Sequence, residues 1–227
     1  MRIPVLVLYA CAMSIVTTSA AWAAGGGSMS MPSVSEREQT PQEKAKELYN
    51  RGVRAIHKAD KYQEKAAAQT DAGKKDRATR DAQDAYADAL DKFQQAVQND
   101  SDLYEAWNYV GYTNRKLGHY DVALTAYERA LALHPGYPEA LEYRGEAYLG
   151  LSRVSDAQQA YLDLFASDRK LADKLLGAMK GWLDAQRGSG SADANTIGEL
   201  DKWIQERTQI AGQTAALTRS GTAAAWN

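Results

Sequence analysis

Apolar residues recur at three- and four-residue spacing along most of the chain, which predicts a succession of amphipathic helices. In the middle of the chain, small residues (Gly111, Ala123) alternate with large ones (Trp107, Tyr127). Two helices that cross closely need small residues at the contact and large ones around it. Gly118 marks the turn between these two helices. The pattern therefore predicts an all-α protein built from helical hairpins.

The pattern returns 34 positions further along the chain. Eight residues have an identical counterpart at this offset: Glu105, Ala106, Tyr109, Gly111, Leu117, Ala123, Ala126 and Tyr127 return as Glu139, Ala140, Tyr143, Gly145, Leu151, Ala157, Ala160 and Tyr161. A fixed period of this size is typical of a stacked helical array. Such an array offers a binding surface rather than a catalytic pocket.

These residues resemble the tetratricopeptide repeat, whose 34-residue pattern is W-x2-L-G-x2-Y…A-x3-F…P. The resemblance implies an all-α helical-hairpin solenoid over residues 41–186. About three repeats are expected, followed by a cap helix: 41–101, 104–137, 138–171 and 171–186. The third repeat has Arg169 where the closing proline is expected, which predicts that its second helix runs on or bends differently.

The first repeat is elongated. Gly52 and Ala89 are 37 residues apart, whereas the equivalent Gly111 and Ala123 are 12 apart, so 25 residues are inserted, within about 59–88. At about 3.6 residues per turn, 25 residues make close to seven whole turns, so two antiparallel helices keep their faces in register. The hairpin is either a solvated extension or a docking arm for a partner or a second copy. Its mixed charge disfavours nucleic-acid binding.

The N-terminus predicts export. Residues 3–16 are largely apolar and lead to Ala21-Trp22-Ala23, an A-x-A cleavage pattern. We expect residues 1–23 to be a cleaved signal peptide and the mature protein to be periplasmic. An uncleaved membrane anchor and lipidation at Cys11 are the alternatives. Residues 24–40 are expected to form a flexible leader.

Three segments follow the array. Residues 187–195 are expected to be a linker, 196–217 an amphipathic helix, and 218–227 a disordered tail. The helix has three possible roles. It packs on the last repeat, folds back into the groove, or binds a partner.

The candidate partner-binding residues lie on the first helix of each repeat, which in such arrays faces the groove. By helical phase they are Tyr49, Val53, His57, Asn108, Tyr112, Arg115, Lys116, Glu139, Glu142 and Glu146. Related domains clamp the C-terminal carboxylate of chaperones with lysines and asparagines. This chain has other residues there, which argues against that mode: Tyr49, Val53, Tyr109, Glu139 and Tyr143.

Composition and motifs give no indication of catalysis. His57, His119 and His134 have no metal-ligand spacing, and no nucleophile elbow or phosphate loop is present. The formal net charge of −2 provides no strong field for nucleic acid. We therefore expect no enzyme activity, no cofactor, and a protein or peptide partner in the cell envelope. Two hypotheses follow: a periplasmic adaptor that binds its partner in the groove, or an oligomerising component that acts through the long hairpin and the C-terminal helix.

Overall fold

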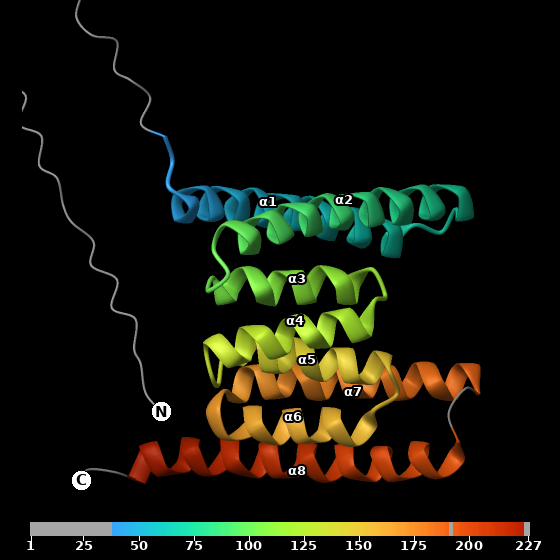
Figure 1. Cartoon of the computed structure of the whole chain (residues 1–227). Helices are drawn as coiled ribbons and strands as arrows, with labels where there is room; N and C mark the ends of the chain where they lie inside the picture. Colours follow the sequence, from blue (N-terminus) through green and yellow to red (C-terminus); the bar gives the residue numbers. More distant parts are fainter. Residues whose placement is uncertain (1–37, 191–192, 225–227) are drawn as a thin grey trace, which may run out of the picture. The chain divides into compact units, whose positions relative to one another are not determined.

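The computed structural model describes residues 38–190 and 193–224, and the expected signal peptide and nearly all of the expected leader lie outside these ranges. The described residues form helices without strands, stacked as antiparallel hairpins (Figure 1). Their bounds are α1 Pro41–Ala68, α2 Ala72–Asn99, α3 Tyr104–Lys116, α4 Tyr120–Leu133, α5 Pro138–Gly150, α6 Val154–Ser167, α7 Arg169–Ser189 and α8 Ala194–Ala224. The all-α solenoid expected from the repeat pattern is confirmed.

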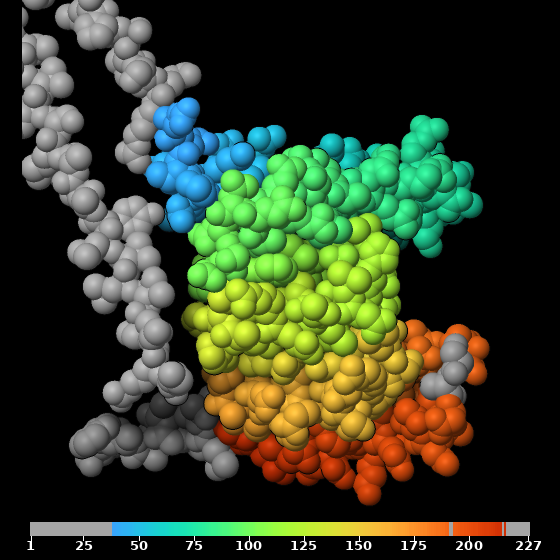
Figure 2. All heavy atoms as spheres, in the orientation of Figure 1, coloured from blue at the N-terminus to red at the C-terminus, as the bar shows by residue number. Residues whose placement is uncertain are grey.

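The first hairpin is longer than those that follow it. Helices α1 and α2 have 28 residues each, against 13 for α3 and 14 for α4. Thr40 caps α1 through a reciprocal capping box with Glu43, and Asp71 caps α2 by accepting a hydrogen bond from the Lys74 amide. In the space-filling view, the far end of this hairpin extends past the edge of the shorter helices beside it (Figure 2).

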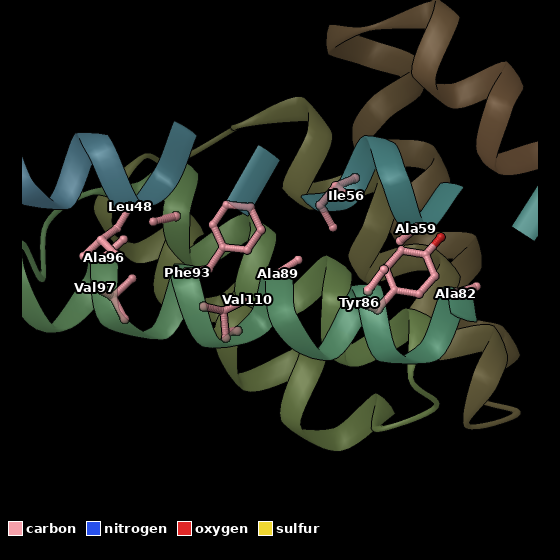
Figure 3. Packing of buried hydrophobic residues seen from close by; sticks show 13 residues of the cluster. Leu48, Ile56, Ala59, Ala82, Tyr86, Ala89, Phe93, Ala96, Val97 and Val110 are labelled. Atoms are coloured by element: carbon pink, nitrogen blue, oxygen red, sulfur yellow. The ribbon is translucent and has the colours of Figure 1, made fainter. Parts of the chain in front are cut away.

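The inserted residues preserve the packing register of a normal repeat. A Cβ added to Gly111 would collide with the Tyr127 ring of the next helix, and one added to Gly52 would lie 2.7 Å from the Phe93 ring. The same close glycine–aromatic contact therefore forms in both hairpins. Figure 3 shows the Phe93 ring directed from α2 toward α1, within a buried row that includes Ala89. Because the insertion makes close to seven whole turns, the contact is retained.

The third repeat ends abruptly rather than running on. Helix α6 stops at Ser167, and Asp168 serves both as its C-cap and as the N-cap of α7. The Asp168 side chain accepts a hydrogen bond from the Leu171 amide at 3.0 Å. The expectation that this helix runs on was therefore wrong, because an aspartate cap ends one helix and starts the next without a proline.

Helix α8 packs on the end of the array. Its Leu200 and Ile204 are buried in one apolar cluster with residues of α6 and α7, and Trp203 meets Tyr161 of α6 edge to face at 5.1 Å. The helix continues to Ala224, so the tail expected from residue 218 is helical up to that point. Alanines at 215, 216, 223 and 224 favour this continuation. Within the described ranges, no helix is both long enough and apolar enough to cross a membrane.

Candidate functional site

The candidate site is the face of α1, α3 and α5 that carries their groove-phase residues. Successive first helices pack side by side in the array, with α3 contacting α5 and α5 contacting α7. Gly52 and Gly111 hold α1 and α3 tightly against their own second helices, and Gly145 of α5 lies against Leu175 of α7 and Ala160 of α6. The opposite side of each first helix is thereby left to carry long aromatic and charged side chains. We call this surface the first-helix face.

Tyrosine rings form a continuous network under the first-helix face. Tyr109 stacks on Phe93 with ring centres 4.9 Å apart, and it meets Tyr49 edge to face at 5.7 Å. Tyr112 lies edge to face with Tyr143 of the next repeat at 5.1 Å. These rings are half-buried, and burial raises the pKa of the Tyr49 hydroxyl to about 12. Edge and stacked contacts fix the rings, so the network is a rigid platform.

A polar cluster lies where the long first hairpin meets α3. The Tyr86 hydroxyl donates toward Asp60 Oδ1 at 2.6 Å, and the Tyr112 hydroxyl approaches the same oxygen at 3.2 Å. Lys116 Nζ donates to Gln63 Oε1 at 2.6 Å. Its ammonium also lies 5.6 Å from the Tyr86 and Tyr112 ring centres. Burial and the nearby Arg115 charge lower the pKa of Lys116. Among the described residues, Lys116 has no carboxylate within ion-pair distance.

Arg115, Glu146, Glu142 and Lys174 form a second, charged cluster across α3, α5 and α7. Arg115 pairs with Glu146, and Lys174 Nζ contacts Glu142 Oε2 at 2.9 Å. Glu142 is fully buried, and its Oε1 has no hydrogen-bond partner among the described residues. Burial and the adjacent Glu146 carboxylate raise the pKa of Glu142 to about 8. Although burial opposes it, the Arg115 charge leaves the pKa of Glu146 below its usual value.

Because its pKa is raised to about 8, Glu142 opposes the nearby Arg115, Lys116 and Lys174 side chains less than an ordinary glutamate would. Within the two clusters, Asp60 and Glu146 are the carboxylates that oppose these three cations. The cluster region thus has a small positive excess, although α5 contributes both Glu142 and Glu146 to it. A surface of this kind favours an acidic group on a ligand.

The structure brings some of the candidate residues together and leaves others apart. Tyr112, Arg115, Lys116, Glu142 and Glu146 lie within the two adjoining clusters. The remaining candidates differ in exposure: Tyr49 and Val53 are half-buried, His57 and Glu139 are exposed, and Asn108 is buried. Asn108 cannot present its amide at the surface as the sequence suggested, because its side chain is only 2% exposed.

Asp60, Tyr86 and Lys174 belong to the clusters but were not predicted from the sequence. Asp60 continues the groove phase of α1 one turn beyond His57, so extending that phase into the insertion would have found it. Tyr86 lies on a second helix, which the repeat pattern assigns to packing. No sequence signal links Lys174 to Glu142, 32 residues earlier.

The first-helix face has no arrangement typical of a catalytic or metal centre. The described ranges contain no cluster of three or more histidine, cysteine, aspartate or glutamate side chains placed to hold a metal ion. Tyrosine rings and the Arg115, Lys116 and Lys174 side chains instead form a surface suited to holding another chain.

A tetratricopeptide repeat family model matches residues 111–170, which span α4, α5, α6 and the end of α3. Residues 111–170 therefore carry tetratricopeptide repeats. Among solved structures, "Crystal structure of MamA" is similar at 19% identity and a TM-score of 0.41, covering 73% of this chain and 87% of that one. "MamA RS-1 ArsTM double mutant" has 19% identity and a TM-score of 0.38, covering 73% and 96%.

Neither similarity assigns a function at this identity and TM-score. No curated protein matches the chain. The repeat family itself indicates a scaffold for protein–protein interaction.

Proposed function

We propose that this tetratricopeptide repeat protein is a non-catalytic periplasmic adaptor. It binds an extended or helical segment of an envelope protein along the first-helix face. Export is supported by the apolar stretch and A-x-A pattern within residues 1–23. The binding role is supported by the repeat family and by the chemistry of the face.

The observation that carries the proposal is the placement of Lys116 beside the tyrosine network. Its ammonium is half-buried over two rings and bonds only to a neutral amide oxygen among the described residues. Arg115, by contrast, is paired with Glu146. A partner segment with an acidic side chain would pair with Lys116 in a partly desolvated site, where a charge-assisted hydrogen bond is strong. Neighbouring rings would hold its apolar groups.

The test is crosslinking in the native periplasm with two charge-reversal variants, Lys116→Glu and Glu139→Lys. Both change the first-helix face without opening the core, because Lys116 is half-buried and Glu139 is exposed. Lys44→Glu, at an exposed site in the first turn of α1, is the matched control. Loss of a captured protein with Lys116→Glu, and its retention with the control, supports the adaptor. Retention with both face variants, in protein that folds normally, overturns it.

A further inference from the structure

The outer side of the first hairpin carries a groove unrelated to the first-helix face. Its volume is about 670 Å³, and its floor is made by Ala55, Tyr62 and Ala85. On α1, the groove residues lie about half a helical turn away from Tyr49 and Asp60, which face the tyrosine network. The groove therefore opens at the end of the array, on the side of the hairpin away from α3.

The two rims of this groove carry opposite charge. The α1 rim is basic and the α2 rim is acidic apart from Lys92: Arg51, Arg54 and Lys58 face Asp81, Asp84 and Asp88. Lys65, exposed, continues the basic row at the same helical phase. Among the described residues, Arg54, Lys58, Asp81 and Asp84 make no ion pair. A terminal repeat needs a polar outer face for solubility, but solubility does not require the two signs to be separated.

We propose that this charge-separated groove is a self-association surface that binds a second copy of the chain. A two-fold axis parallel to the hairpin places α1 of one copy over α2 of the other. Each basic rim then meets an acidic rim, twice by symmetry. A two-fold axis across the hairpin would place α1 over α1 and oppose like charges. The separation of charge therefore selects one of the two face-to-face arrangements.

The register of the hairpin supports the parallel axis. Gly52 lies against Phe93, and Tyr86 bonds to Asp60, which fixes which residues of α1 and α2 share a level. By this register Lys58 is level with Asp88, and Lys65 is level with Asp81. Rotation about a two-fold axis parallel to the hairpin keeps each residue at the same height along the helices. Lys58 of one copy therefore meets Asp88 of the other, and Lys65 meets Asp81. Ala55 and Ala85, the small residues of the floor, allow the helices of the two copies to approach on either side of Tyr62.

The assembly is expected to be reversible and sensitive to salt, because exposed ion pairs are individually weak. Raising the salt from about 0.1 M to about 1 M shortens the screening length from roughly 10 Å to 3 Å. We expect this change to weaken self-association by at least about tenfold. The proposal is independent of partner binding, since the two surfaces lie on opposite sides of α1.

Sedimentation of the purified protein over a range of concentrations tests the proposal. One variant, Lys58→Glu with Lys65→Glu, reverses the charge at the two α1 positions that are level with Asp88 and Asp81, and leaves the α1 rim without a net positive charge. A second, Asp81→Lys with Asp88→Lys, makes both rims basic. Each variant alone should remain monomeric, whereas an equimolar mixture should form a heterodimer, because opposite rims then meet again. Lys170→Glu with Lys202→Glu, at exposed sites on α7 and α8, is the matched charge control and should dimerise normally.

Three results would overturn the proposal. One is a wild-type protein that stays monomeric at low salt. Another is self-association that both rim variants retain, which would place the interface elsewhere. The third is a mixture of the variants that fails to dimerise although circular dichroism shows both to be folded. None of these results would affect partner binding on the first-helix face.

Discussion

Replacing Glu142 with glutamine should stabilise the protein, and increasingly so as the pH rises. The carboxyl is fully buried, and burial together with Glu146 raises its pKa from 4.5 to about 8. Below pH 4.5 the carboxyl is neutral in both the folded and unfolded states. Between pH 4.5 and about 8 the unfolded state has lost the proton while the folded state retains it. The free energy of unfolding must therefore fall as the pH rises through this window.

The size of the effect follows from the difference between the folded and unfolded pKa. A tenfold change in acidity corresponds to about 1.4 kcal/mol, so the rise in pKa from 4.5 to about 8 sets a ceiling of about 5 kcal/mol. Glu142 shares its site with Glu146 and with the half-exposed Lys174, and relaxation of these groups reduces the cost. We expect Glu142→Gln to be about 2–3 kcal/mol more stable than wild type near pH 8. Near pH 4.5 the two proteins should differ by less than about 1 kcal/mol.

Urea unfolding of both proteins at these two pH values measures the difference. Glu139→Gln is the matched control, because it removes an exposed carboxyl from the same helix. A stability difference for Glu142→Gln that is the same at both pH values would refute the reasoning. A variant that becomes relatively less stable at high pH would show that the Lys174 contact outweighs the cost of burying the charge.

Three further predictions concern packing and caps, each measured as the free energy of unfolding in urea. Gly111→Ala should destabilise by about 1–3 kcal/mol, because its Cβ collides with Tyr127. Gly177→Ala, in α7 with open space around it, should instead stabilise by up to about 1 kcal/mol, and equal effects at the two sites would contradict the packing argument. Thr40→Ala should cost about 1 kcal/mol by removing the capping box, whereas Thr40→Ser should cost little. Trp203→Ala should cost about 2 kcal/mol by loosening α8 from Tyr161; no loss of stability would mean that α8 is not docked.

The sequence was sufficient for the repeat architecture because its signals are local and periodic. Gly52, Gly111 and their aromatic partners recur at positions that helix geometry converts directly into contacts. The elongated hairpin followed from counting turns. The end of α6 was mispredicted because a single residue, Asp168, is both the C-cap of α6 and the N-cap of α7, and no closing proline marks the boundary.

The candidate site was only partly predictable. Helical phase placed Tyr112, Arg115 and Lys116 on one side of α3, where they take part in the two clusters, because phase is a property of one helix. Helical phase gave no information on how deeply a side chain is buried, so Asn108 and Glu142 were expected at the surface although both are buried. Depth depends on how closely neighbouring repeats pack, and on contacts such as Lys174–Glu142 between distant residues. The charge state of Glu142 could not be predicted from the sequence either, because its pKa is raised by burial, which the sequence does not show.

The long first hairpin has a consequence for how this protein can change its dimensions during evolution. Because Gly52 and Phe93 meet as Gly111 and Tyr127 do, the arm tolerates only length changes that bring each helix back to the same rotational setting. About seven residues, two turns, added to or removed from both helices of the arm at once would satisfy this condition. A change of two or three residues in one helix alone would turn its alanine row out toward water. The length of the first hairpin should therefore change during evolution only in steps of about two turns, and homologues with a hairpin of intermediate length should be rare.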